Sequence, residues 1–182
     1  MNPSTVLLMF FTFSLIFTVY ASSPSPLPSP SPSVKLFQTV CKDVKENERC
    51  FKLLESYPEI TSAESYLELC RYILKMAIRK ATEGQNYLKE VMKKNPSSHA
   101  IQECAVDDYD HLVTLFQASL NDLVRDPMFA NYLAMAAGDG AVNCNNALAQ
   151  EKITSPSLSS LNNEMDFVSL VAGVATDHLY PS

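Results

Sequence analysis

The sequence predicts an all-α protein: an up-down-up-down four-helix bundle preceded by a disulfide-pinned N-terminal helical hairpin. Three observations lead to this prediction. Long segments carry apolar residues three and four positions apart, which is the spacing of one helix face. The connections between these segments are short, which favours antiparallel neighbours. The cysteines lie where two antiparallel helices would bring them level with each other.

The chain begins with an apolar run, residues 6–19, and its first charged side chain is Lys35. Small residues follow the run, and Val19 and Ala21 occupy the −3 and −1 positions of a cleavage site. We interpret residues 1–21 as a secretory signal peptide. The alternative is a membrane anchor, but a run of ~14 residues is short for the ~20 that a span needs. We therefore expect export and no membrane association after cleavage.

Residues 22–33 read SSPSPLPSPSPS, a composition that favours extended polyproline II and cannot form a packed core. We interpret them as a spacer, with contact to a wall polymer through modified prolines as the alternative. The folded domain is then expected at residues 34–180. The net charge of the chain is −6. An acidic domain without a clustered basic patch is not expected to bind nucleic acid.

In an oxidising compartment, five cysteines suggest two disulfides and one remaining thiol. Cys104 lies 22 residues before Asp126 and Cys144 lies 18 residues after it. If both arms are helical, they run ~33 Å out and ~27 Å back, so the sulfurs return to nearly the same level. We therefore predict a Cys104–Cys144 bond at the open end of a helical hairpin, and a Cys41–Cys50 bond in the N-terminal segment. No CxxC spacing occurs and the histidines are scattered, so we predict no metal site and no cofactor.

Residues 34–61 predict one or two short helices that end at Pro58. Residues 62–94 predict one long helix, capped by Thr61 or Ser62 and stopped by Asn95-Pro96. Its apolar seam is Leu67, Cys70, Leu74, Ala77, Ala81, Gly84, Leu88 and Val91. Because Cys70 lies on this seam, we predict a buried free thiol that packs as a small hydrophobe, with a reactive thiol as the alternative.

The next helix is predicted to begin at Ser97 or Ser98 and to run to about residue 125. Its predicted inner side comprises Ile101, Cys104, Leu112, Leu115, Ser119 and Leu123, with Phe116 and Leu120 alongside. Three acidic residues, Asp107, Asp108 and Asp110, are interpreted as a solvated face. Acid–base chemistry or calcium binding is the alternative, but no calcium loop surrounds them.

Asp126 suits the N-cap of the third helix and Pro127 suits its first position. Gly138-Asp139-Gly140 interrupts the pattern, and we predict a kink or break there because glycine disfavours a helix interior. A phosphate-binding loop is the alternative, but the glycines lack the required spacing. Residues 154–160 are predicted to be a loop, and residues 161–179 the last helix.

The chain resembles the plant invertase/pectin methylesterase inhibitor family over residues 34–180. The matching features are the secretory signal, Cys41 with eight residues to Cys50, the long helix, Cys104 opening the next helix, and Cys144 on the third. The resemblance implies a four-helix bundle with an N-terminal helical hairpin. It also implies disulfides between the first and second and between the third and fourth of these cysteines. One departure is that Tyr109 lies five residues after Cys104, where the family has a tyrosine four residues after.

Asp126-Pro127-Met128-Phe129 resembles the invertase-inhibitor branch, which has Pro-Lys-Phe on the tip that enters the invertase active site. The resemblance implies that these four residues bind the target. Met128 replaces the lysine that could pair with a catalytic carboxylate. The alternative is an ordinary helix start in which Phe129 packs down against its own helix.

The resemblance implies a secreted, proteinaceous inhibitor, not an enzyme, that blocks an acid invertase of the cell wall (apoplast) or vacuole by filling its active site. The alternative target is a pectin methylesterase, whose pectin cleft would be covered by the acidic side of the bundle, including Glu103, Asp107 and Asp110. A secreted protein without a target is a third possibility. We expect a monomer, because Cys70 is predicted to be too buried to link two chains.

Overall fold

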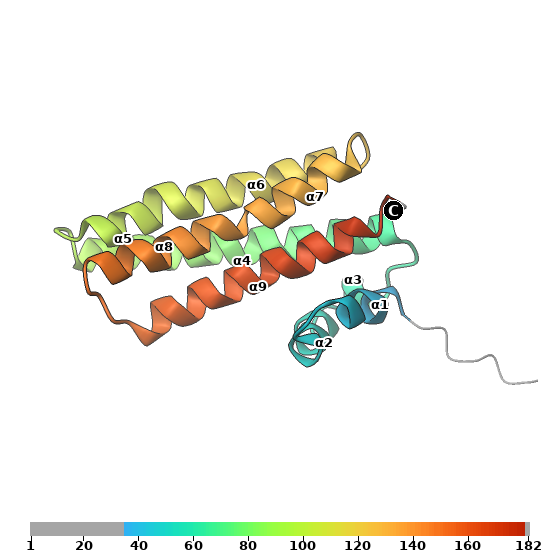
Figure 1. The fold of residues 1–182 in the computed structure, drawn as a ribbon, viewed down its shortest axis with the longest axis horizontal. Coiled ribbons are helices and arrows are strands. Elements are labelled where there is room, and N and C mark those ends of the chain that lie inside the picture. The colour runs from blue at the N-terminus through green and yellow to red at the C-terminus, as the bar shows by residue number, and fades with distance from the viewer. Residues whose placement is uncertain (1–34, 181–182) are drawn as a thin grey trace, which may run out of the picture. The chain divides into compact units, whose positions relative to one another are not determined.

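The structure, a computed structural model, describes residues 35–180, and within this range every regular element is helical (Figure 1). The predicted signal peptide and the Ser/Pro spacer lie outside the described residues. Four long segments form an antiparallel bundle, so the predicted fold class is confirmed. The segments are α4 (Tyr66–Lys94); α5 (His99–Glu103), η1 (Cys104–Asp108) and α6 (Tyr109–Asp122); α7 (Pro127–Ala136) and α8 (Gly138–Gln150); and α9 (Pro156–Asp177). They close a ring, because α4 packs on α6 and α9, while α7 contacts both α6 and α9.

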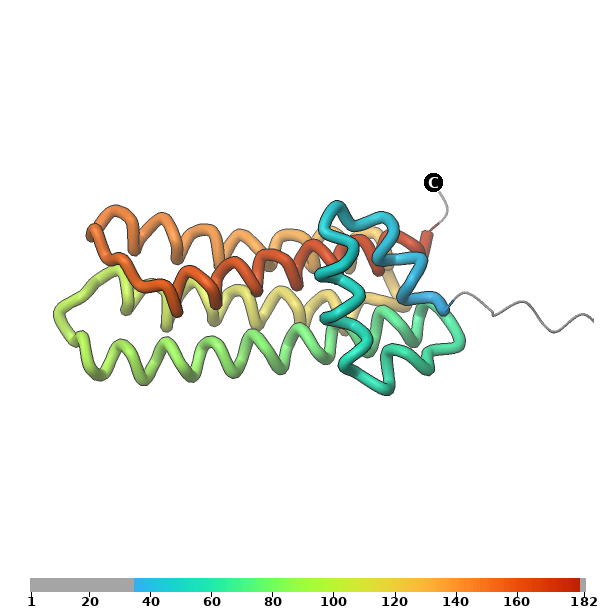
Figure 2. The backbone as a smooth tube through the Cα atoms, turned by 90° about the horizontal axis from the view of Figure 1, so that it is seen from below, coloured from blue at the N-terminus to red at the C-terminus, as the bar shows by residue number. Residues whose placement is uncertain are grey.

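The N-terminal segment forms three short helices, α1 (Leu36–Asp43), α2 (Asn47–Glu55) and α3 (Pro58–Thr61), that lie across one end of the bundle (Figure 2). The Cys41–Cys50 disulfide joins α1 to α2. Arg49 fastens α2 to α9: its guanidinium donates to the Asn163 carbonyl at 3.0 Å and lies 3.9 Å from the centre of the Phe167 ring.

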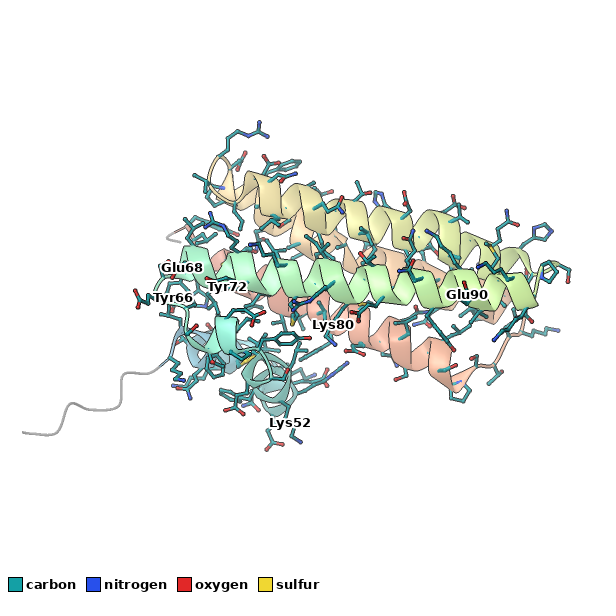
Figure 3. All side chains as sticks on the ribbon, turned by 180° about the vertical axis from the view of Figure 1, so that it is seen from behind. Lys52, Tyr66, Glu68, Tyr72, Lys80 and Glu90 are labelled. Carbon is teal, nitrogen blue, oxygen red and sulfur yellow. A yellow bond between two sulfur atoms is a disulfide. The ribbon has the colours of Figure 1, made fainter. Side chains whose placement is uncertain are left out.

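Helix α4 begins later than the sequence predicted, because Ser65 is its N-cap and accepts a hydrogen bond from the Glu68 backbone. The predicted start at residues 61–62 is wrong, since Thr61 belongs to α3 and Pro58 begins that helix. The predicted seam does face the core. An ion pair joins α4 to α9: Lys80 Nζ lies 2.5 Å from Glu164 Oε1 (Lys80 is labelled in Figure 3).

The second long segment is not a uniform α-helix. Ser98 is its N-cap, as predicted, but residues Cys104–Asp108 form a π-helical turn in which the Tyr109 amide donates to the Cys104 carbonyl five residues back. Such a turn accommodates one extra residue within a helix. It therefore explains why the tyrosine follows Cys104 by five residues: Tyr109 is fully buried, and its hydroxyl donates to Asn162 Oδ1 at 2.8 Å.

The prediction that the acidic cluster is a solvated face is wrong for one of its members. Asp107 and Asp110 are exposed, but Asp108 is only 8% exposed because it lies one turn after Cys104, on the inner face. Its Oδ2 atom has no hydrogen-bond partner among the described residues. Burial, followed by the charges of Glu103 and Asp107, raises the pKa of Asp108 to about 6.

The break predicted at Gly138 lies one residue earlier, at Ala137, and α7 and α8 follow one another end to end (Figure 1). Ala137 keeps right-handed helical torsions, φ −57° and ψ −31°. The glycines instead allow close packing, since a Cβ atom on Gly140 would lie 2.5 Å from the Asp108 carbonyl oxygen. The predicted loop at residues 154–160 is also wrong beyond Ser155, which caps α9, because Pro156 occupies the first turn of that helix.

Candidate functional site

The connection between α6 and α7 forms a closed turn at one end of the bundle, and we call residues 122–129 the tip (Figure 1). Asp126 is the N-cap of α7: its Oδ1 accepts from the Phe129 amide at 3.0 Å, and its own amide donates to the Asp122 carbonyl at 2.8 Å. Pro127 follows at the start of the helix, where a missing amide proton carries no penalty. Local chemistry therefore fixes the backbone of the tip.

Five large apolar side chains at and beside the tip are exposed to solvent. They are Val124 (69% exposed), Met128 (68%), Phe129 (45%), Tyr132 (64%) and Met135 (45%), and we call them the apolar stripe. The Phe129 and Tyr132 rings stack with their centres 6.1 Å apart. Exposed apolar patches of this kind on soluble proteins mark interaction sites.

The structure places the sequence-predicted site residues together but gives them different roles. Asp126 and Pro127 shape the turn, while Met128 and Phe129 supply exposed surface. Phe129 stacks on Tyr132 of its own helix, as the alternative of an ordinary helix start expects, but nearly half of its surface stays exposed to solvent.

The sequence predicted a site at residues 126–129 only, so Tyr132 and Met135 were not included in it. A signal was present: Met128, Tyr132 and Met135 have the spacing i, i+4, i+7, which defines a single helix face. Leu133 lies on a different face and is buried. Helix α7 thus has two apolar faces, one for the core and one for solvent.

Hydrogen bonds from both neighbouring helices hold the backbone of α7. From α6, the Ser119 hydroxyl donates to the Ala130 carbonyl at 2.7 Å. From α9, the Ser169 hydroxyl donates to the Ala134 carbonyl at 2.7 Å. In the other direction, the Asn131 amide group donates to the Gly173 carbonyl of α9 at 2.6 Å. The four members of the apolar stripe that lie on α7 are therefore carried by a helix with little freedom to move.

Small residues let α7 approach α9 closely. Ala130, Ala134 and Ala137 are fully buried on the inner face. A Cβ atom on Gly173 would lie 2.0 Å from Met135 Sδ, so only glycine at position 173 accommodates the methionine side chain in this place. Met135 thus rests on α9 while nearly half of it stays exposed.

The tip also carries one cation, Arg125. Its side chain is 81% exposed, and one of its terminal nitrogens pairs with the Asp122 carboxylate, whose side chain is 11% exposed. The tip therefore combines an apolar surface with a guanidinium anchored at its edge.

Other chemistry-bearing groups are buried within the bundle. Burial raises the pKa of the Cys70 thiol to about 12, and this thiol donates to the Ala175 carbonyl at 3.0 Å. Both observations favour an unreactive, buried thiol over a reactive one. The sulfurs of Cys104 and Cys144 lie near Asp108, but they form a disulfide and are not thiolate ligands for a metal. No helix within residues 35–180 has the length and apolar character that crossing a bilayer requires.

The model of the family described as plant invertase/pectin methylesterase inhibitor matches residues 35–176. Among solved structures, a mutant form of a pectin methylesterase inhibitor from Arabidopsis superposes with a TM-score of 0.70 at 19% identity, covering 81% of this chain and 99% of that one. A pectin methylesterase inhibitor from Arabidopsis thaliana superposes with a TM-score of 0.59 at 19% identity, covering 80% and 97%. A comparison with curated proteins gives no match. The structural likeness, at this identity, shows the shared fold.

Proposed function

The chain belongs to the plant invertase/pectin methylesterase inhibitor family, and we propose that it inhibits an acid invertase by inserting its tip into the active site of the enzyme. The members of this family are inhibitors and not enzymes, and they are typically extracellular. The observation that carries the choice of target is the apolar stripe, which is presented at a projecting turn by a helix fixed on both sides.

The proposed mechanism is occlusion. Met128 and Phe129 would enter the sugar-binding pocket, and Tyr132 and Met135 would cover its rim. A fixed surface loses little conformational entropy on binding, so more of the contact energy contributes to affinity. Exposed aromatic residues are also the side chains that most often dominate the affinity of an interface.

A pectin methylesterase is the second candidate target. Glu103, Asp107 and Asp110 are exposed on the side of the bundle away from the tip, where they could face a cleft shaped for a polymer. In that mode the apolar stripe would contribute little to inhibition.

The deciding experiment titrates the refolded protein against an acid invertase and a pectin methylesterase at acidic pH, measuring sucrose hydrolysis and methanol release. We expect the protein to abolish sucrose hydrolysis. We expect Tyr132→Ser to weaken this inhibition of the invertase about tenfold or more. The matched control is Tyr87→Ser, because Tyr87 is 43% exposed on α4 and lies outside the stripe. Inhibition of methanol release alone would favour the second candidate, and inhibition of neither enzyme would favour a protein without these targets.

A further inference from the structure

The position of Arg125 in the sequence is unusual. Between Lys94 and Lys152 it is the only lysine or arginine, and no lysine or arginine follows Lys152. The chain as a whole is acidic, with a net charge of −6. The sole cation of the α5–α8 region thus lies beside the exposed apolar stripe, at the turn that projects from the bundle.

One contact joins this side chain to the bundle. The Asp122 carboxylate, itself mostly buried, receives a hydrogen bond from one terminal nitrogen, Nη2. A guanidinium has five N–H donors in a planar fork, so one contact leaves most of them available. Among the described residues, Asp122 is the one hydrogen-bond partner of Arg125, and the side chain is 81% exposed.

Only the arginine of this pair is exposed, and the water around its guanidinium screens the attraction, so the pair adds little to the stability of the fold. Asp122 instead limits the freedom of the arginine arm, which lowers the entropy lost when the free edge of the guanidinium meets a second acceptor. A planar fork of donors matches a carboxylate, with which it forms two parallel hydrogen bonds.

Glycoside hydrolases place two carboxylates beside the scissile bond. Resting on the proposed function, we infer that Arg125 is a specificity-determining residue, whose free guanidinium edge binds a carboxylate in the acidic active site of the invertase. The apolar stripe supplies contact area, and Arg125 selects a pocket of negative charge. An apolar tip without this cation would leave the carboxylates of the occluded pocket unpaired, which is unfavourable once water is excluded.

The test measures the inhibition constant of the full-length refolded protein for an acid invertase at low and at high salt. Arg125→Gln is expected to raise the inhibition constant about tenfold or more, and Arg125→Lys to give an intermediate value, because lysine keeps the charge but loses the fork. The matched control is Arg79→Gln. Arg79 is also exposed and paired with a carboxylate, Glu59 at 3.6 Å, but on α4 and α3. Arg79→Gln should change the inhibition constant by less than about twofold.

Added salt should weaken inhibition by the natural protein more than inhibition by Arg125→Gln, since the lost contact is electrostatic. An Arg125→Gln constant equal to that of an inhibiting natural protein would overturn this inference and leave the proposed function standing. A natural protein that does not inhibit invertase would overturn both. If Arg125→Gln fails to fold, as judged by circular dichroism, Arg125→Lys replaces it. An inhibition constant for Arg125→Lys equal to that of the natural protein, with the same salt dependence, would then overturn the inference.

Discussion

At the scale of single residues, Asp108 is the clearest mismatch between a side chain and its surroundings. A carboxylate with a buried oxygen that has no hydrogen-bond partner, as Asp108 Oδ2 has none among the described residues, is unfavourable in its charged form. Its pKa is raised from 3.8 to about 6, mainly by burial. The folded state therefore holds a proton at pH values where the unfolded chain has lost it. It follows that the stability contributed by this group is full below pH 3.8 and is lost as the pH rises to about 6.

We predict that Asp108→Asn stabilises the protein at neutral pH by roughly 1–2 kcal/mol, because the amide cannot ionise and solvent screens part of the effect. The gain over the natural protein should grow between about pH 4 and pH 6 and stay constant above that range. Urea unfolding at several pH values measures it. Asp107→Asn is the control, since Asp107 is exposed. Equal pH profiles for the natural protein and Asp108→Asn would show that Asp108 ionises normally.

Met128 is the residue at which this tip departs from the Pro-Lys-Phe of the branch it resembles. We predict that Met128→Lys raises affinity for an acid invertase, because a lysine there adds a charge that can pair with an active-site carboxylate. Binding to a pectin methylesterase should remain nearly unchanged, since the side of the bundle is not altered. Inhibition constants for both enzymes give the answer. An unchanged invertase constant would argue against docking through the tip.

At the scale of helices, the π-turn and the start of α8 form one packed unit. The turn brings the Asp108 carbonyl against Gly140, and the Cys104–Cys144 disulfide joins the same two segments. Tyr109 then reaches Asn162 of α9, whose side-chain amide donates to Asn145 Oδ1 at 2.8 Å. Gly84 of α4 lies against the Tyr109 ring, so all four bundle segments meet at this point.

We predict that Gly140→Ala destabilises the protein by about 1–3 kcal/mol, despite the higher helix propensity of alanine. The added Cβ atom would lie 2.5 Å from a backbone oxygen, so a whole helix must shift. Thermal or urea unfolding measures the change. The control is Asp139→Ala at the exposed neighbouring position, which should change stability by less than about 0.5 kcal/mol. A stabilised Gly140→Ala would mean that α8 can move away from η1 without loss.

At the scale of the whole molecule, the two disulfides constrain different parts of the fold. Cys41–Cys50 spans 9 residues within the N-terminal hairpin, whereas Cys104–Cys144 spans 40 residues and joins two long segments of the bundle. In the chain-entropy account, the longer loop restricts the unfolded chain more. The bundle should therefore depend more on the second bond.

We predict that replacing Cys104 and Cys144 by alanine lowers the free energy of unfolding by about 4 kcal/mol, and replacing Cys41 and Cys50 by about 3 kcal/mol. Alanine suits these buried positions because it adds no polar group. Chemical denaturation of the two double variants provides the comparison. Hydrogen exchange adds a spatial test: the first change should increase exchange across the bundle, and the second mainly in α1–α3. A larger loss from the hairpin bond would contradict this ranking.

Much of this protein was predictable from its sequence because the relevant signals are local. Apolar spacing predicted α4 and its buried seam, and Asp126-Pro127 predicted the start of α7. Cysteine spacing, with the antiparallel arrangement, predicted the two disulfides that the structure contains. Helix ends were less predictable: Ser65 and Ser155 serve as caps where residues nearby also qualified.

Only the tertiary structure decided which faces are covered. Periodicity shows that Met128, Tyr132 and Met135 share a face, but not that this face is left in solvent while Leu133 packs inward. The π-turn adds one residue, which shifts the inner face of the helix by one position. A regular helical period therefore could not predict that the neighbours Asp108 and Tyr109 are both buried. Burial depends on which helices lie alongside, and that is a property of the assembled bundle and not of any single segment.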